Sequence, residues 1–146
     1  NFSQTISIML DNIQDPGNLG TIIRIGDWFG IKNIVCSADC ADAFAPKVVQ
    51  STMGSIVRVN LLYTDLVKLV KEQKLLHLYA ATLNGEKLND MQPIKEGIIV
   101  IGNESRGIHP ELLACCQKKI TIQRIGVAES LNAAVAAGII LSHLTV

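Results

Sequence analysis

The sequence predicts an α/β fold in which a mostly parallel sheet carries helices on both faces. Strand-like and helix-like segments alternate along all 146 residues, and this alternation is typical of parallel strands that are joined by helices. Hydrophobic residues make up 49% of the chain and aromatic residues only 4%. The core must therefore be aliphatic, which suits strands that are buried on both faces. The length suits one domain.

The first half of the chain is predicted to open with a strand, a polar loop and a helix. Alternating apolar residues indicate a strand at residues 3–10. The loop at residues 11–18 is rich in turn formers, and the helix after it runs to about Phe29, where Gly30 ends it. Arg24 lies in the second turn of this helix. The further elements expected are a strand at 31–36, a loop at 39–52 with a short helix after Pro46, a strand at 56–59 and a helix at 64–74 that Thr64 caps.

The second half continues the alternation and ends in an apolar helix. The elements expected are a strand at 75–81 that ends in a turn at 82–85, a strand at 98–101, a helix from Pro110 that carries Leu112, Leu113 and Cys116, and a strand at 119–122. Ser130 or Asn132 opens the last helix, because both side chains accept hydrogen bonds from free backbone amides. Residues 131–141 are apolar on nearly every side, so this helix must be buried in a core or against a partner. The run is about half of the roughly 20 residues that span a bilayer, which excludes a transmembrane helix.

Three Gly-containing loops follow predicted strands, at residues 82–85, 102–107 and 123–129. In open parallel sheets, ligands bind beyond the carboxyl ends of the strands. The convergence of the three loops therefore predicts a small-molecule site. No GxGxxG motif follows the first strand and no GxxxxGK[ST] motif occurs in the chain, which argues against an ordinary dinucleotide site and a phosphate-binding loop.

The charged and metal-binding residue types point to no bulk nucleic-acid surface and no metal site. The formal net charge is zero, so RNA contacts would need a local patch, for which Lys47, Arg58 and Arg106 are candidates. The four cysteines show no CxxC pairing and are expected to be reduced packing residues of a cytoplasmic protein. We interpret the three isolated histidines as structural; they are His77, His109 and His143.

Three blocks of the sequence together resemble the SpoU (TrmH-like) family, the RNA ribose 2′-O-methyltransferases of the SPOUT class. The blocks are DPGNLGTIIR at residues 15–24 with DWFG at 27–30, IGNESRGI at 101–108, and IQRIG at 122–126 with SLNAAVA at 130–136. Their order and spacing match the family, and the resemblance covers essentially the whole chain.

The resemblance implies an enzyme that transfers a methyl group from S-adenosyl-L-methionine to a ribose 2′-hydroxyl of tRNA or rRNA, without a metal. It also implies an α/β domain whose C-terminal part forms a deep trefoil knot that holds the cofactor. The positions that match the family's cofactor site are Leu83, Gly102, Ile122 and Leu131, with Thr82 and Gly107 in the same loops. The apolar members of this set can form a slot for an adenine ring.

The resemblance further implies a homodimer that packs the first-block helix and the C-terminal helix together. Ala133, Ala134, Ala137 and Gly138 would allow close approach of two helices. The residues themselves leave a second interpretation open, in which these small side chains belong to the core of a single chain.

The family's catalytic positions match Asn18, Arg24, Glu104, Ser130 and Asn132. Arg24 is expected to hold the target phosphate and to stabilise the developing alkoxide, because a guanidinium stays protonated and is a poor base. Asn18 would orient the ribose or Arg24, and Glu104 would organise the cofactor loop. Ser130 and Asn132 would make hydrogen bonds near the reacting groups. The alternative interpretations are a surface salt bridge for Arg24, an N-cap for Asn18 and an exposed turn carboxylate for Glu104.

Two observations keep other functions open. Gln123 and Arg124 stand where many family members have proline and an apolar residue, beside the expected cofactor slot. The neutral charge predicts weak RNA binding by this domain alone, so we expect residues 1–146 to be the catalytic domain of a longer protein with an N-terminal RNA-binding segment. The alternatives are a non-catalytic module of the same fold, which binds cofactor or RNA, and an ordinary Rossmann-type methyltransferase.

Overall fold

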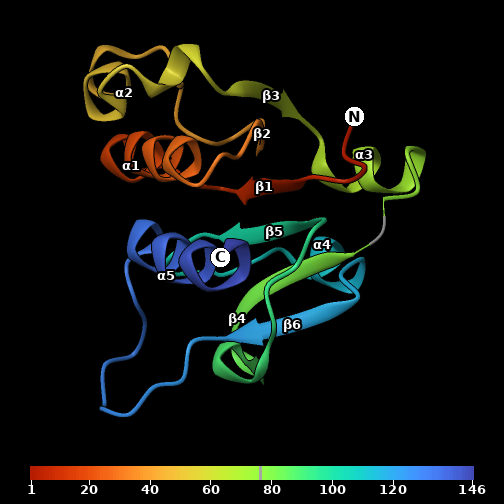
Figure 1. The fold of residues 1–146 in the computed structure, drawn as a ribbon. Coiled ribbons are helices and arrows are strands. Elements are labelled where there is room, and N and C mark those ends of the chain that lie inside the picture. The colour runs from red at the N-terminus through yellow and green to blue at the C-terminus, as the bar shows by residue number, and fades with distance from the viewer. Residues whose placement is uncertain (76) are drawn as a thin grey trace.

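The computed structural model describes residues 1–75 and 77–146, and Figure 1 shows the arrangement of their helices and strands. Six strands form one sheet in the order β3-β2-β1-β5-β4-β6, and all pairings between these strands are parallel. The fold class predicted from the sequence is therefore confirmed. The knot that the resemblance implies stays a prediction.

The helices and strands, in chain order, are β1 (Ile6–Asp11), α1 (Pro16–Trp28), β2 (Asn33–Ser37), α2 (Pro46–Thr52), the 3₁₀ helix η1 (Ser55–Val57), β3 (Asn60–Thr64), α3 (Leu66–Glu72), β4 (Leu78–Lys87), the 3₁₀ helix η2 (Leu88–Asp90), β5 (Gly97–Gly102), α4 (Pro110–Ala114), β6 (Lys118–Thr121) and α5 (Ala133–Thr145).

The central strand β1 is buried on both faces. Ile8 lies opposite Ile34 of β2 and Ile99 of β5 in the sheet register. Ile8 and Leu10 belong to one apolar core, to which α1, α2 and α5 contribute. Met9 belongs to the other core, to which α3 and α4 contribute. An aliphatic strand between two helical layers is the arrangement that the composition predicts.

Helices α1 and α3 begin at side-chain caps that differ from the residues expected. Asp15 caps α1 by accepting from the backbone N–H of Asn18 at 2.9 Å, so Asn18 is the third helical residue rather than the cap. Asp65, not Thr64, caps α3. Because α1 begins at Pro16, Arg24 lies in its third turn and not in its second.

The predicted strand at 56–59 is wrong. Gly54 adopts a left-handed conformation with φ of 91°, and the chain then makes the 3₁₀ turn η1 before β3 begins at Asn60. Val57 is 82% exposed instead of buried in a sheet. A left-handed residue interrupts an extended strand, so the apolar pair Ile56-Val57 could not continue one.

The second half of the chain differs from the prediction in strand β4 and in helix α4. Strand β4 does not end before residue 82 but continues to Lys87, with a register shift against β6 between Ala81 and Glu86. Helix α4 ends at Ala114, so Cys116 lies outside it. The strand expected at 75–81 includes Leu76, which lies outside the described residues.

The C-terminal helix α5 is buried along one side only. Ala137, Ile140 and Leu141 pack in the core against α1, whereas Val135 is 51% and Ile139 40% exposed. Ala133, Ala134 and Ala137 are buried in the core of the single chain, as the second interpretation of these small residues expects, while the stripe with Val135 and Ile139 is uncovered. In the described part of the chain, no helix is both long enough and apolar enough to cross a membrane.

Candidate cofactor and RNA site

Loops at the carboxyl ends of β5 and β6, together with the irregular middle of β4, line a cavity of about 680 Å³. This volume lies within the range of roughly 300–1,000 Å³ that is typical of small-molecule sites. The prediction of a site at the carboxyl ends of the strands, made from three Gly-containing loops, agrees with this cavity. Residues of β4 and β6, the loop before α5 and the loop after β5 all line the cavity.

All six residues that the sequence assigns to the cofactor line this cavity. Leu83 is 69% and Leu131 46% exposed, although both are large apolar side chains. Apolar walls with nearby backbone N–H and C=O groups fit an adenine ring and a thioether chain, which need contact area and a few hydrogen bonds. The residues present therefore fit S-adenosylmethionine. The six residues are Thr82, Leu83, Gly102, Gly107, Ile122 and Leu131.

Two glycines shape the loop after β5. Gly107 has φ of 69°, a conformation that favours glycine. A Cβ atom on Gly102 would lie 2.4 Å from the carbonyl carbon of Gly107, so no larger residue fits there. Asn103 and Gly107 exchange backbone hydrogen bonds of 3.2 and 2.8 Å across the loop. The loop is thus a closed turn that presents Glu104 at its tip.

A chain of hydrogen bonds joins three of the five predicted catalytic residues. The side-chain amide of Asn18 donates to Oε1 of Glu104. The side-chain amide of Asn132 donates to Oδ1 of Asn18 at 2.9 Å. Oδ1 of Asn132 in turn caps α5 by accepting from the N–H groups of Ala134 and Val135. These contacts bring together the beginnings of α1 and α5 and the loop after β5. Of the two predicted helix openers, the structure selects Asn132 and not Ser130.

The other two predicted catalytic residues are not part of this chain of contacts. Ser130 lines the cavity beside Glu129. Arg24 is exposed on α1 and makes no hydrogen bond or ion pair within the described residues. The predicted alternative of a surface salt bridge for Arg24 is therefore not seen in that part of the chain.

Two of the three candidate phosphate contacts are engaged by other side chains of the chain. Arg58 is engaged by Asp27 at 2.8 Å, and the hydrogen bond from Arg58, supported by one from Ser55, lowers the pKa of the Asp27 carboxyl. Arg106 donates to Oδ1 of Asn12 at 2.8 Å. Lys47 lies on α2. Neither arginine has an unengaged guanidinium.

Two histidines have contacts that fit the structural role predicted for them. The ring of His109 lies 3.2 Å from the buried carboxylate of Asp11, and Nε2 of His143 lies 2.7 Å from the carbonyl oxygen of Met91. The described residues contain no group of three or more His, Cys, Asp or Glu side chains that would hold a metal ion. All four cysteines are free thiols.

The sequence does not single out Asn103, which lines the cavity, or Asn12, to which Asn103 is hydrogen-bonded. Asn103 stands within the second block and Asn12 directly follows β1. The available signal was an asparagine at the carboxyl end of each of two strands, which the structure shows to be neighbours. The sequence alone does not reveal that β1 pairs with β5, and without this pairing the two asparagines cannot be identified as neighbours.

Comparison with known proteins gives a consistent result. The model of the SpoU rRNA Methylase family matches residues 5–142. The chain is 35% identical over 140 residues to the 23S rRNA (guanosine(2553)-2′-O)-methyltransferase RlmP of Bacillus subtilis, an alignment that covers 94% of this chain and 56% of that protein.

Two solved structures are similar throughout the fold. An AdoMet-bound rRNA methyltransferase from Sinorhizobium meliloti superposes with a TM-score of 0.89 and 30% identity, over 96% of this chain and 55% of that one. The SpoU methyltransferase AviRb from Streptomyces viridochromogenes, in complex with AdoMet, has a TM-score of 0.88 and 26% identity, over 97% and 60% of the two chains. The chain thus spans little more than half the length of these relatives.

Proposed function

The chain belongs to the SpoU rRNA methylase family, and we propose that it transfers a methyl group from S-adenosylmethionine to a ribose 2′-hydroxyl of rRNA or tRNA. The observation that carries this proposal is the chain of contacts from Glu104 through Asn18 to Asn132 beside the cavity. The name of the RlmP relative, which specifies 2′-O-methylation of 23S rRNA, supports the reaction class. The two AdoMet-bound relatives support the cofactor.

The cavity is the proposed cofactor site. Bound S-adenosylmethionine supplies an activated methyl group, so that the protein mainly has to position the reactants and accept one proton. Leu83, Ile122 and Leu131 would contact the apolar parts of the cofactor. The backbone of residues 102–107 would supply hydrogen bonds, because its glycines allow close approach.

Glu104 is the proposed acceptor of the hydroxyl proton. Its Oε1 atom is engaged by Asn18, whereas Oε2 makes no hydrogen bond within the described residues. Asn18 is in turn held by Asn132, which is fixed at the beginning of α5. This arrangement directs one carboxylate oxygen while the other stays available to the ribose. Ser130, at the rim of the same cavity, would make a further hydrogen bond near the reacting groups.

Arg24 has an electrostatic role in this proposal. Its guanidinium is exposed and unengaged in the described part of the chain, and a guanidinium keeps its proton at all ordinary pH values. Such a group binds a phosphate and favours negative charge on the ribose oxygen, but it does not remove the proton.

We propose a homodimer that covers the exposed stripe of α5 and the adjoining end of α1. Trp28 is 84% exposed, and Val135 and Ile139 are about half exposed on the neighbouring helix. Helices α1 and α5 pack side by side (Figure 1). A second copy of the chain would bury this apolar surface and bring Arg24 of one subunit near the interface.

We also propose that the chain is the catalytic domain of a longer RNA-binding protein. The relatives are nearly twice its length, and its zero net charge provides little of the phosphate attraction on which RNA affinity depends.

The direct test is transfer of an isotope-labelled methyl group to RNA. The protein, in its full natural length, is incubated with labelled S-adenosylmethionine and unmodified rRNA or tRNA transcripts, and the RNA is digested to nucleosides for mass spectrometry. The proposal predicts label on the ribose 2′-oxygen. Label on a base, or cofactor binding without any labelled nucleoside across both RNA classes, would contradict it. The same assay tests the role of Arg24 through the Arg24→Ala variant. Its matched control is Arg58→Ala, because Arg58 is an arginine that already pairs with Asp27.

A further inference from the structure

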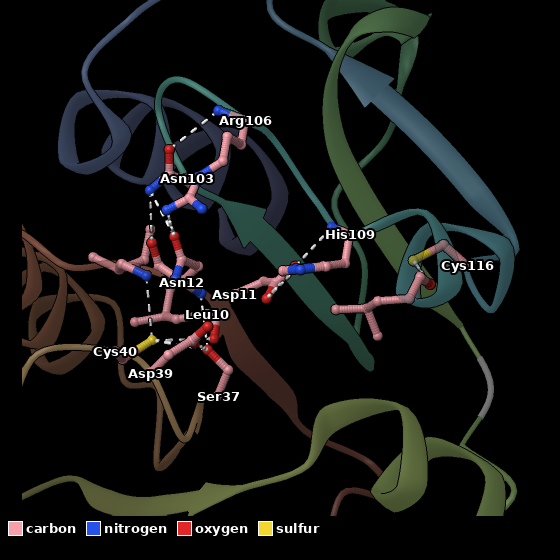
Figure 2. Close-up of polar contacts among 12 residues, drawn as sticks. Leu10, Asp11, Asn12, Ser37, Asp39, Cys40, Asn103, Arg106, His109 and Cys116 are labelled. Atoms are coloured by element: carbon pink, nitrogen blue, oxygen red, sulfur yellow. Dashed lines mark hydrogen bonds and ion pairs between the residues drawn. The ribbon is translucent and has the colours of Figure 1, made fainter.

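We propose that Asn12 and Asn103 form a tie between two loops that positions Glu104, and that both are positioning residues for the methyl transfer. This inference rests on the proposed function for its effect on rate, but the tie itself is open to a separate structural test. Figure 2 shows Asn12 between two groups of side chains, with Asn103 and Arg106 on one side and Ser37, Asp39 and Cys40 on the other.

Asn103 uses every hydrogen-bonding position of its side chain. Its Nδ2 atom donates to the carbonyl oxygen and to Oδ1 of Asn12, at 3.0 and 2.9 Å. Its Oδ1 atom accepts from the backbone N–H groups of Ser105 and Arg106, at 2.8 and 3.1 Å. The first pair of bonds connects two loops, and the second pair closes the turn around Glu104. A surface asparagine with no role beyond solubility does not have this set of partners.

The burial and the backbone conformation of Asn12 fit its role as the acceptor of these bonds. It is only 4% exposed and has φ of 60°, a conformation that asparagine tolerates better than most residues. Its backbone N–H donates to Oγ of Ser37 at 2.8 Å. Its Oδ1 atom accepts from both Asn103 and Arg106. Asn12 therefore anchors the loop after β5 to the ends of β1 and β2.

The two loops are joined at two points. Asn12 lies on the connection from β1 to α1 and Asn18 in the first turn of α1, while Asn103 and Glu104 are consecutive residues after β5. Asn12 meets Asn103, and Asn18 meets Glu104. Because Asn103 precedes Glu104 directly, any shift of Asn103 moves the carboxylate that Asn18 orients. A displacement of about 1 Å at a reacting group can reduce a rate roughly 100-fold.

Two substitutions weaken the tie from opposite sides and leave the turn around Glu104 intact. Asn103→Asp keeps the acceptor for Ser105 and Arg106 but removes both donated bonds to Asn12. Asn12→Gly removes one of those two bonds and the acceptor for Arg106, and glycine adopts a positive φ without strain. Lys74→Gly is the matched control, because Lys74 is a residue with φ of 49° far from the site in sequence.

The first measurement is the NMR signal of the Asn18 side-chain amide, which donates to Glu104 in the wild type. In Asn12→Gly and Asn103→Asp, we expect this signal to move toward its position in Glu104→Ala. In Lys74→Gly, it should stay at its wild-type position. A merely destabilising substitution would not move this one signal, and a thermal melt of each variant confirms that it is folded. Unmoved signals in both variants would overturn the tie, whatever the activity of the protein.

The second measurement is a double-mutant cycle on the methylation rate. We expect kcat to fall roughly 10–100-fold in Asn103→Asp and about tenfold in Asn12→Gly. The double variant should resemble Asn103→Asp alone, because both changes act through one contact. Multiplied losses, or an unchanged kcat in either single variant, would refute the positioning role. A wild-type protein that lacks methylation would refute the proposed function, while the NMR result would still decide the tie.

Discussion

The side-chain amide of Asn132 donates to Oδ1 of Asn18 across 2.9 Å, although 114 positions separate the two residues in the chain. The same Asn132 side chain caps α5 through its oxygen atom. One residue thus begins the last helix and, through its other atom, fixes a residue of the first. The position of Asn18 in the candidate site therefore depends on how α1 packs against α5.

Because Asn132 caps α5 with its oxygen and contacts Asn18 with its nitrogen, substitutions can change the stability of the helix and the activity of the site independently. Asn132→Asp keeps an oxygen for the helix cap and adds a negative charge at the helix N-terminus, so we expect the free energy of unfolding to be retained. It removes the donor to Asn18, so methylation should fall at least tenfold. Asn132→Ala should lose about 1 kcal/mol of stability as well. Urea unfolding and initial rates check both values, and an active Asn132→Asp enzyme would refute the role of the contact.

Arg24→Ala should abolish most activity without affecting the fold. Arg24 is exposed and unengaged in the described residues, so the free energy of unfolding should change by less than about 0.5 kcal/mol. Loss of one electrostatic group that stabilises a transition state typically lowers kcat about 100- to 1,000-fold. Full activity in Arg24→Ala, measured beside the Arg58→Ala control, would remove Arg24 from the mechanism.

Leu83→Ala should weaken cofactor binding alone. The side chain is mostly exposed in the cavity wall, so its removal should leave thermal stability nearly unchanged. Full burial of a leucine by a ligand is worth about 1.5–3 kcal/mol, and we expect at least a tenfold rise in the Kd of S-adenosylmethionine. Leu62→Ala is the control, because Leu62 is a partly exposed leucine of β3 that does not line the cavity. Equal affinities in the two variants would place the cofactor elsewhere.

Val135→Asp should convert the proposed dimer into a monomer. A charge in the middle of the exposed apolar stripe of α5 would have to be buried without a partner at the interface, which is costly. Light scattering should report half of the wild-type mass, whereas Leu62→Asp should keep the wild-type mass. A monomeric wild type, or a dimeric Val135→Asp variant, would contradict the proposed interface.

The pair of Asp27 and Arg58 predicts one feature of acid unfolding. Hydrogen bonds from Arg58 and Ser55 lower the pKa of Asp27 below its ordinary value of 3.8. A carboxyl whose pKa is lowered by folding contributes stability above its unfolded pKa and loses it as the pH falls through the folded pKa. Below about pH 4, Arg58→Ala should therefore lose less stability with falling pH than the wild type. The difference is small because the Arg58 side chain is largely exposed. Parallel curves for the two proteins would contradict it.

The parts of the fold that local sequence encodes were predicted well. The alternation of strands and helices follows from patterns within a few residues, and one of the two expected openers of the last helix, Asn132, is its cap. The strand expected at 56–59 is wrong because Ile56, Val57 and Val59 have the apolar character of a strand, whereas the chain turns at the left-handed Met53 and Gly54 and forms η1. The extension of β4 to Lys87 depends on pairing with β6, which is a long-range contact.

The candidate site shows the same difference between what local sequence indicates and what long-range packing decides. The resemblance supplied Asn18, Glu104 and Asn132 as separate positions, but their mutual contacts depend on how α1, α5 and β5 pack. The sequence does not single out Asn12 and Asn103, because the contact between them is also long-range. Each has the appearance of an ordinary loop asparagine until the sheet order places β1 beside β5. Cytoplasmic location, the dimer and the preceding RNA-binding segment stay predictions.

The most direct test of the central claim is a calorimetric titration of the wild-type protein with S-adenosylmethionine, repeated with Leu83→Ala and Leu62→Ala. We expect binding with a micromolar Kd, competition by the demethylated product, and a weakened affinity in Leu83→Ala only. Absence of binding by the folded wild-type protein would contradict the assignment of the cavity to this cofactor, and with it the proposed methyl transfer.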